Sequence, residues 1–209
     1  MISQWKIESQ LPLSYEIKNS PNVLSIDNED ILKYGNQVEG RRRIIAVDKK
    51  VADYYLDEIK NYFNYHKINH KIVLLDGGEV NKSLESLLYL LDEIEKFGLN
   101  RLSEPIIAIG GGVMLDVVGL AATLYRRGVP YIRIPTTLLS IVDVSVAIKT
   151  GINFRDRRNR LGSYFPPLAT LLDKTFIKTT ANLDISSGFG EIIKMAVSKD
   201  SKLFNILEK

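Results

Sequence analysis

Short apolar segments alternate with helical patterns through the middle of this chain, and this alternation limits the possible folds more than any other feature. Each apolar segment ends on or beside aspartate, glycine or threonine, and helical spacing follows the first three. Gly98 and Gly128 mark the ends of the second and third helical patterns. The four segments are residues 43–48 (RIIAVD), 71–79 (KIVLLDGGE), 105–112 (PIIAIGGG) and 131–137 (YIRIPTT).

This order of strands and helices predicts an α/β fold, in which a parallel sheet is covered by helices on both faces. The residues that follow parallel strands meet at one edge of the sheet, and ligands bind there. We therefore expect Asp48, residues 76–79, Gly110–Gly112 and the pair Thr136 and Thr137 to converge.

The flanking segments give weaker patterns. Residues 4–20 alternate apolar and polar side chains on both sides of Leu11 and Pro12, which favours an N-terminal β-hairpin, and a short helix is expected around residues 30–34. Residues 140–167 are polar, rich in Gly and Arg and without periodicity, so we expect an irregular functional segment. A further strand at 169–173 and one or two helices from 184 onward complete the chain, with Ser186 or Ser187 as the helix cap.

Composition excludes several classes of protein. The 209 residues are 45% hydrophobic and contain no cysteine, so a disulfide framework and a thiolate metal site are excluded. A net charge of +3 gives no reason to expect a nucleic-acid partner. The sequence also has no apolar run long enough to span a membrane, and we expect a cytoplasmic protein without a membrane partner.

The three glycines at 110–112 suggest a phosphate-binding turn. They do not form the G-x-G-x-x-G fingerprint, because Leu115 stands where its last glycine belongs, and no G-x-x-x-x-G-K-[ST] loop is present. Glycine between a strand and a helix still lets backbone N–H groups approach a pyrophosphate. A plain tight turn is the alternative, with Asp116 acting only on the helix dipole.

Two further groups of polar residues have alternative interpretations. His66 and His70 are four residues apart, but Lys67 replaces the glutamate of an HExxH motif, so we interpret them as surface histidines. A cationic set in the segment 143–160 could bind phosphate or could be a solvated loop. That set is Asp143, Lys149, Asn153, Arg158, Asn159 and Arg160.

Taken together, several motifs resemble the dehydroquinate synthase-like sugar phosphate cyclases. The resemblance runs in order from about Arg43 to the C-terminus, and it is most specific between Gly110 and Pro167. Iron-dependent alcohol dehydrogenases share the GGGxxxD element but lack the PTTL…D…KTG run. The motifs are DGGEVNK, GGGVMLDVVGLAATLYRRG, RIPTTLLSIVDVSVAIKTGIN, RNRLGSYFPP and GFGEIIK.

Around Lys149 the sequence resembles one group of these enzymes in particular. Dehydroquinate synthases usually read S-x-G-G-K-T-G, whereas residues 145–151 read SVAIKTG. Together with RNRLG, this is more similar to the 2-epi-5-epi-valiolone synthases, which cyclise sedoheptulose 7-phosphate. The dehydroquinate synthase branch remains the alternative, as does a non-catalytic relative that binds NAD.

The resemblance implies a Rossmann-like NAD-binding domain over residues 1–180 and the start of a helical metal- and substrate-binding domain over 181–209. It also implies transient oxidation by NAD, elimination of phosphate and an intramolecular aldol closure, with a divalent metal, zinc or cobalt, as Lewis acid. Carried over by motif, the cofactor residues are Asp48, Glu79, Lys82, Gly111, Gly112, Asp116, Thr136, Thr137, Asp143, Arg158 and Thr179.

The same resemblance implies the substrate and metal residues. Arg158 stands where lysine is common in the family, and Arg127 is expected to reach the substrate phosphate from a neighbouring subunit, which implies a dimer. The implied catalytic residues are Asp143, Lys149, Asn159, Lys194 and Arg127, and Glu191 is the implied metal ligand.

One departure from the family pattern matters. The family's metal site needs two histidines from its C-terminal domain, whereas the two histidines here lie far upstream, at 66 and 70. We therefore expect the N-terminal half of a split enzyme, with a second polypeptide that supplies the other ligands; a truncated product of a longer enzyme is the alternative. The split enzyme predicts an exposed apolar face on the last helices, formed by Ile192, Ile193, Met195, Phe204 and Leu207.

Overall fold

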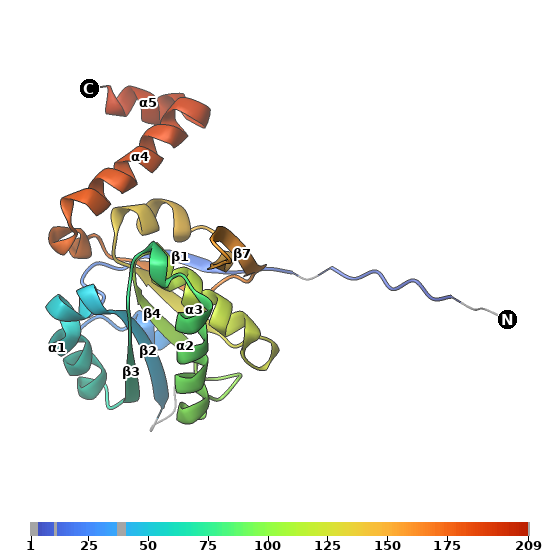
Figure 1. Cartoon of the computed structure of the whole chain (residues 1–209). Coiled ribbons are helices and arrows are strands. Elements are labelled where there is room, and N and C mark those ends of the chain that lie inside the picture. The colour runs from blue at the N-terminus through green and yellow to red at the C-terminus, as the bar shows by residue number, and fades with distance from the viewer. Residues whose placement is uncertain (1–3, 11, 37–40, 209) are drawn as a thin grey trace.

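A parallel β-sheet forms the centre of the molecule, as the alternating pattern predicts (Figure 1). The structure is a computed structural model that describes residues 4–10, 12–36 and 41–208. Within these residues the sheet has six strands in the order β1-β8-β5-β4-β2-β3, and every neighbouring pair is parallel. The strands are β1 (Glu16–Asn19), β2 (Arg42–Asp48), β3 (Asn69–Leu75), β4 (Ile106–Gly110), β5 (Tyr131–Pro135) and β8 (Ala169–Leu172).

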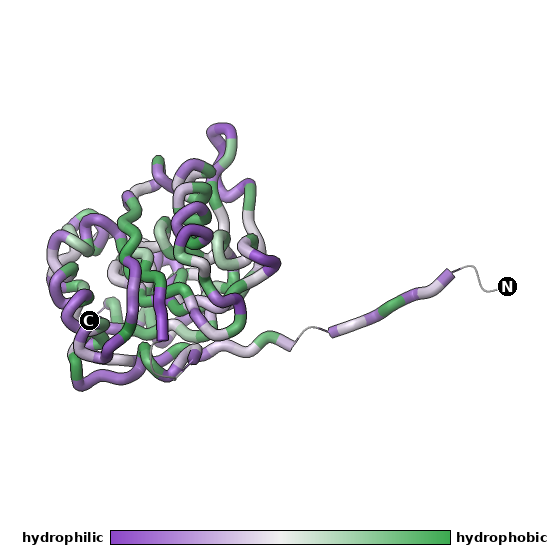
Figure 2. The backbone as a smooth tube through the Cα atoms, turned by 90° about the horizontal axis from the view of Figure 1, so that it is seen from below, coloured by the Kyte–Doolittle hydropathy of each residue, from purple (hydrophilic) through white to green (hydrophobic). Residues whose placement is uncertain are grey.

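Helices cover both faces of the sheet. Helix α1 (Lys49–Tyr65) lies on one face, and α2 (Leu84–Phe97) and α3 (Gly112–Leu124) lie on the other (Figure 1). Successive residues of β2 divide between the two cores, since Ile45 packs in the α1 core and Ile44 in the α2–α3 core. Figure 2 shows the hydropathy of the same backbone, with hydrophobic segments within the domain. Burial on both faces explains why these strands read as continuous apolar runs.

The helices begin and end where local chemistry predicts. The Asp48 side chain caps α1 by accepting a hydrogen bond from the Lys50 amide, and Ser83 caps α2 through the Ser86 amide. Gly98 ends α2 in the left-handed conformation, with φ of 65°. The short helix expected around residues 30–34 is η1 (Ile31–Lys33).

The predicted N-terminal hairpin is wrong. β1 pairs in parallel with β8, and neither residues 4–10 nor residues 12–15 form a strand; Leu11 lies outside the described residues. The segment before β1 leads away from the domain (Figures 1 and 2). Period-two alternation shows that a segment suits the surface of a sheet, but it does not give the identity or the direction of the partner strand.

The prediction of an irregular segment at 140–167 is also wrong. Residues Ser140–Val144 form a π-helical turn (η4), and β6 (Lys149–Phe154) pairs with β7 (Arg157–Tyr164) as an antiparallel hairpin. Arg155 and Asp156 form its two-residue tip with φ values of 46° and 59°. Tips of this type usually carry Asn-Gly or Asp-Gly, so the sequence lacked the signal by which such a hairpin is recognised.

The chain then crosses the carboxyl edge of the sheet. After β8 come η5 (Lys174–Thr179), α4 (Asn182–Lys199) and α5 (Ser201–Leu207). α4 begins before the two serines predicted as its cap, and their hydroxyls bond to carbonyls inside the helix. It contacts the segment around η4, where a Cβ on Gly188 would lie 2.6 Å from the Leu138 side chain. Within the described part of the chain, none of the helices has the length and apolar character of a membrane span.

Close packing between α3 and the hairpin gives the first prediction. A Cβ on Gly119 would lie 2.4 Å from Cγ2 of buried Thr150 in β6, so Gly119→Ala should lower the free energy of unfolding by about 1–2 kcal/mol despite the better helix propensity of alanine. Gly190 in α4 has open space around it, and Gly190→Ala should be neutral or raise that free energy by up to about 1 kcal/mol. Urea unfolding of both variants measures the difference, and equal effects would contradict the packing argument.

Candidate functional site

The ends of three strands meet around Asp48, which ends β2 and is 8% exposed. A Cβ on Gly110, at the end of β4, would lie 2.9 Å from the Asp48 Cβ, and a Cβ on Gly77, just after β3, would lie 2.4 Å from its Oδ2. A Cβ at either position would force neighbouring side chains to shift, so both positions favour glycine. The loops after β3 and β4, which the sequence places at one edge of the sheet, therefore meet at the Asp48 side chain, at the end of β2.

The N-terminus of α3 faces this meeting point. Gly111 is the N-cap residue and has no side chain to cap the helix, so the first amides of α3 have no such partner. A Cβ on Gly112 would lie 3.2 Å from Val144 of η4, and a Cβ on Gly111 would lie 3.4 Å from Thr137. The turn is thus closely covered by the segment that follows β5.

Thr136 supplies a polar group that the protein leaves unused. Its Oγ1 is buried and has no hydrogen-bond partner among the described residues, while its amide donates to the Gly110 carbonyl at 3.0 Å. An unpaired buried hydroxyl is unfavourable by about 1–3 kcal/mol unless a ligand pairs with it. Together with the glycine-lined helix terminus, this atom fits a bound dinucleotide.

Thr137 and Thr179 bond to elements around this region. The Thr137 hydroxyl bonds to that of Ser140, which fixes the start of η4. Thr179, at the end of η5, bonds to Tyr55 of α1 at 3.1 Å, and Thr180 donates to the Thr136 carbonyl. The segment after β8 is therefore held against both α1 and the end of β5.

Lys82 lies at the centre of a polar network. Its ammonium is nearly buried, at 7% residue exposure, and it pairs with Asp116 of α3 at 2.6 Å. The same Nζ donates to the Asn159 side chain of β7 at 2.6 Å. This network brings together three of the residues that the sequence assigns to the cofactor or the substrate.

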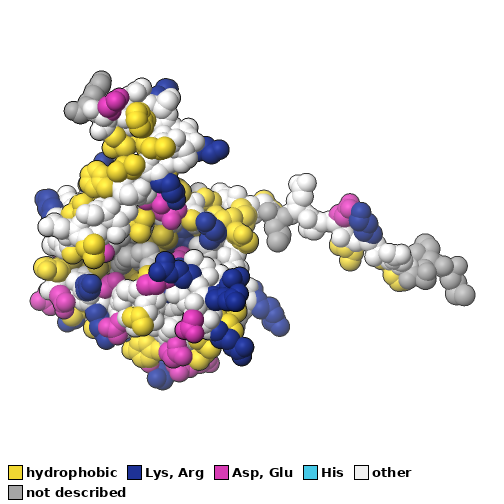
Figure 3. All heavy atoms as spheres, turned by 45° about the horizontal axis from the view of Figure 1, so that its top comes forward, with side chains coloured by type: hydrophobic (Ala, Val, Ile, Leu, Met, Phe, Trp, Pro, Cys, Tyr) yellow, Lys and Arg dark blue, Asp and Glu magenta, His cyan; other side chains and the backbone are white. Residues whose placement is uncertain are grey.

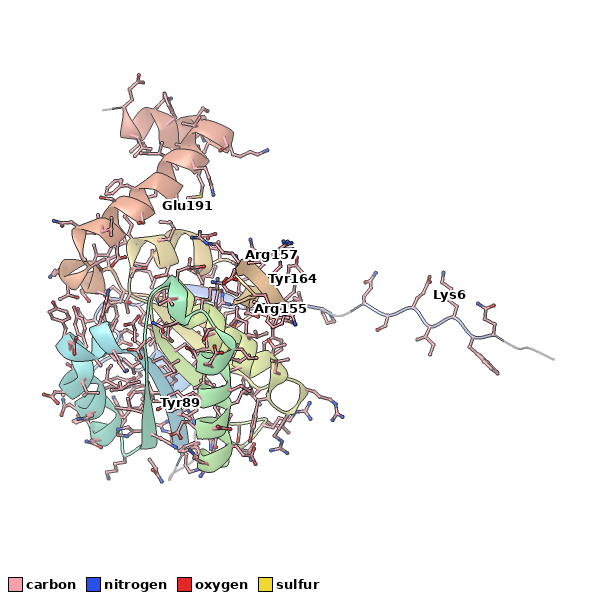
Figure 4. All side chains as sticks on the ribbon, in the orientation of Figure 1. Lys6, Tyr89, Arg155, Arg157, Tyr164 and Glu191 are labelled. Atoms are coloured by element: carbon pink, nitrogen blue, oxygen red, sulfur yellow. The ribbon has the colours of Figure 1, made fainter. Side chains whose placement is uncertain are left out.

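The hairpin side of the network is open to solvent. A cleft of about 490 Å³ lies between residues 79–85 and residues 153–158. Glu79 accepts a hydrogen bond from Asn153 at 2.9 Å and lies 3.7 Å from the Arg158 guanidinium. Arg155, Arg157 and Tyr164 project outward from the same hairpin (Figure 4).

Asp143 in η4 and Lys149 at the start of β6 are both exposed. Asp143 is close enough to Asp116 for its charge to raise the pKa of that carboxyl. Burial is the largest cause of this raised pKa, and the charge of Lys82 opposes it.

Arg133 is a residue of the site region that sequence reasoning missed. It is fully buried in β5, and its Nη1 donates to the carbonyls of Val144 and Ala147 at 2.9 and 2.6 Å. Its Nη2 donates to the Tyr131 hydroxyl. The guanidinium thus holds the segment between Asp143 and Lys149. In the sequence, the feature that could have revealed this role is an arginine inside the apolar strand YIRIP.

Arg127 lies away from the glycine turn that begins α3. It lies in η3 (Tyr125–Arg127), beyond the C-terminal end of α3, about 20 Å along the helix from Gly112 at 1.5 Å per residue.

Glu191 and Lys194 lie one turn apart on α4 and form an ion pair with each other. Glu191 lies where α4 passes above the domain, and α4 contacts η4 (Figure 4). Among the described residues no group of three His, Asp or Glu side chains could hold a metal ion. The residues present therefore do not form a zinc site, which takes three protein ligands at catalytic centres.

The histidines are half-buried rather than on the surface. His66 ends α1 beside the ring of Tyr62, and His70 lies in β3 beside the ring of Phe63. The predicted apolar face on the last helices is present in part: Ile193, Phe204 and Leu207 are exposed, whereas Ile192 and Met195 are half-buried.

Comparison with known proteins identifies the family. The 3-dehydroquinate synthase N-terminal family model matches residues 72–187, which is more than half of the chain. The chain belongs to this family. It is 41% identical over its whole length to a 2-epi-5-epi-valiolone synthase from Actinomyces sp., of which it covers 55%.

Solved structures agree with this assignment. ValA, the 2-epi-5-epi-valiolone synthase of Streptomyces hygroscopicus subsp. jinggangensis 5008, with NAD⁺ and Zn²⁺ bound, matches with a TM-score of 0.91 and 37% identity, over 98% of this chain and 55% of ValA. A 2-deoxy-scyllo-inosose synthase complexed with carbaglucose-6-phosphate, NAD⁺ and Co²⁺ matches with a TM-score of 0.74 and 28% identity, over 86% of this chain and 48% of that protein. The chain spans about half the length of these relatives, and the expected Rossmann-like fold is confirmed.

The buried carboxyl of Asp48 gives a prediction about pH. Burial raises its pKa above the ordinary value of 3.8, and the Lys50 amide opposes this only in part. The folded state therefore binds more protons than the unfolded state between the two pKa values, and stability falls as pH rises through that window. Asp48→Asn keeps an acceptor for the Lys50 amide, so it should be more stable than the unaltered chain at about pH 7.

The difference should shrink as the pH approaches about 3, where the carboxyl is protonated in both states. Urea unfolding across this pH range measures the difference in free energy of unfolding between the variant and the unaltered chain. Asp57→Asn, at an exposed position of α1, controls for the loss of one negative charge. A variant that is less stable at neutral pH would contradict the assigned burial cost.

Proposed function

We propose that this chain is the cofactor-binding half of an NAD-dependent sugar phosphate cyclase that acts on sedoheptulose 7-phosphate. The observation that carries the proposal is the buried ammonium of Lys82, which joins Asp116, on the cofactor side, to Asn159, on the phosphate side. Family membership and the similarity to 2-epi-5-epi-valiolone synthases support the reaction class.

NAD is assigned to the edge of the sheet where β2, β4 and β5 end. Asp48 accepts hydrogen bonds from ribose hydroxyls, the amides of Gly111 and Gly112 face the pyrophosphate, and the Thr136 hydroxyl gains the partner it lacks. The other assigned cofactor residues are Glu79, Lys82, Asp116, Thr137, Asp143, Arg158 and Thr179. The bound NAD of structurally similar ValA and the unpaired Thr136 oxygen support this assignment.

The substrate phosphate is assigned to Lys149 and Asn159, with Arg158 beside them. A phosphate accepts several charge-assisted hydrogen bonds, and the two strands of this hairpin offer an exposed lysine and a side-chain amide. Asp143 projects from η4 near Asp116 and is assigned to the substrate hydroxyls. When bound, NAD supplies reversible removal of hydride from a ring carbon, and the residues of this chain orient that carbon and hold the leaving phosphate.

Only one ligand of the proposed metal site is assigned to this chain. Glu191 is proposed as one ligand of a zinc or cobalt site and Lys194 as a substrate contact, with the other ligands from outside this chain. A second polypeptide that carries the helical domain is the proposed source. Support comes from the lengths of the relatives and from the hydrophobic side chains gathered over α4 and α5 (Figure 3). Those exposed on these helices include Leu183, Ile193, Val197, Phe204 and Ile206.

Two alternatives remain for the activity. A 3-dehydroquinate synthase half is compatible with the family model, and its substrate carries a carboxylate that needs an additional cation. The second alternative is a non-catalytic protein that binds NAD, in which only the cofactor residues have a function. Dimerisation, with Arg127 of a second copy at the substrate phosphate, is part of the proposal for either enzyme.

Reconstitution tests the proposal. The chain alone should bind NAD⁺ but release no phosphate from sedoheptulose 7-phosphate, and adding a helical C-terminal half of a 2-epi-5-epi-valiolone synthase should give NAD- and zinc-dependent phosphate release. Lys149→Met in the reconstituted protein should lower that rate by at least about 100-fold, since the phosphate loses a charged partner. The exposed Lys174→Met at the start of η5 is the matched control.

The other outcomes separate the alternatives. Phosphate release only from the linear heptulosonate phosphate would assign the chain to the dehydroquinate branch. NAD⁺ binding without turnover in any combination would favour the non-catalytic relative, and full activity of the chain alone would refute the split enzyme.

A further inference from the structure

We propose that Asn153 is a positioning residue that sets the geometry of Asn159 and couples the hairpin to the cofactor side of the site. The role deepens the proposed function, because Asn159 is assigned there to the substrate phosphate. Asn153 itself contacts neither assigned ligand, and its effect is exerted through Asn159, Glu79 and Lys82.

The hairpin is irregular at Asn153. In the ladder between β6 and β7, Ile152 pairs with Leu161 and Phe154 pairs with Arg157, so the register shifts across Asn153. Three residues of β7, Arg158–Arg160, therefore lie opposite Asn153 alone. Bulges place extra residues on one strand and redirect side chains, and they are common beside functional sites. At this position the backbone amide turns away from β7 and donates to the Lys82 carbonyl at 2.8 Å.

Both ends of the Asn153 amide group are used. Its Nδ2 donates to Glu79 Oε1 at 2.9 Å, and its Oδ1 accepts from the backbone amide of Asn159 at 2.9 Å. The side chain therefore bridges the turn 79–82 and the second strand of the hairpin. With the Lys82 contact, Asn153 bonds to three residues that the proposed function places in the site.

The bond to Asn159 acts on an unfavourable backbone conformation. Asn159 has φ of 54°, in the left-handed region, and asparagine tolerates this region better than most residues but still at a cost. An acceptor placed at its amide selects that conformation. The side chain of Asn159 is then directed to Lys82, whose Nζ donates to its Oδ1 at 2.6 Å.

Only a neutral side-chain amide makes both bonds at this place. Aspartate keeps the acceptor for the Asn159 amide but has no donor for Glu79 and puts two carboxylates together. Alanine removes both bonds. These differences allow the two links to be separated by mutation.

The experiment uses the whole chain and two readouts. The first is the hydrogen-exchange rate of the Asn159 amide in ¹⁵N-labelled protein, and the second is affinity for NAD⁺ and for inorganic phosphate by titration calorimetry. Asn153→Ala should speed exchange of the Asn159 amide by at least about 10-fold and weaken phosphate binding. Asn69→Asp, on an exposed asparagine at the opposite end of β3, is the control and should change neither.

A swap of donor and acceptor tests the link to Glu79. Asn153→Asp alone should weaken binding of both NAD⁺ and phosphate by about 5- to 10-fold, whereas Asn153→Asp with Glu79→Gln restores a donor opposite an acceptor and should recover most of the phosphate affinity. A purely structural loss would not be recovered by a second substitution.

The outcomes distinguish this proposal from the proposed function. Unchanged exchange of the Asn159 amide in Asn153→Ala, or no recovery in the double variant, would overturn the role of Asn153. If the unaltered chain binds neither NAD⁺ nor phosphate, the proposed function fails, and the exchange rate of the Asn159 amide still decides whether Asn153 positions that residue.

Discussion

The buried ammonium of Lys82 is the interaction on which the candidate site depends. A charge removed from water is unfavourable by several kcal/mol unless it is paired and fully hydrogen-bonded, so the fold must supply partners. It does so from two separate elements, Asp116 of α3 and Asn159 of β7. The same charge therefore fixes the distance between the helix that follows the glycine turn and the hairpin, and loss of either partner would loosen both sides of the site.

Close backbone approach is the second requirement of the site. Gly77 and Gly110 leave room for the Asp48 side chain. The fully buried guanidinium of Arg133 donates hydrogen bonds to the carbonyls of Val144 and Ala147. The space beside the two glycines places the Asp48 carboxylate between strand ends. The hydrogen bonds of Arg133 fix the segment that leads from Asp143 to Lys149. Steric room and buried hydrogen bonds thus set the positions of side chains that are themselves exposed.

Much of the sheet could be predicted from the sequence because both of its faces are buried, so β2 and β4 read as unbroken apolar runs that end in Asp48 and glycine. The convergence of Asp48, Gly110 and Gly77 follows from the parallel direction of the strands. The hairpin could not be predicted, because Arg155 and Asp156 occupy positions that usually carry glycine or asparagine. The direction of β1 depends on β8, about 150 residues later, and no local pattern encodes such a partner. The motifs identified the candidate site residues. The hydrogen bonds of Asn153 and Arg133 could not be predicted, because they join segments that only the folded chain brings together.

A crystal structure of the chain grown with NAD⁺ tests the central claim most directly. The account predicts the pyrophosphate beside the amides of Gly111 and Gly112, the adenosine ribose at Asp48, and the Thr136 hydroxyl within hydrogen-bonding distance of the cofactor. A cofactor bound elsewhere, or a Thr136 hydroxyl that stays unpaired with NAD⁺ present, would contradict the claim that these strand ends form a dinucleotide site.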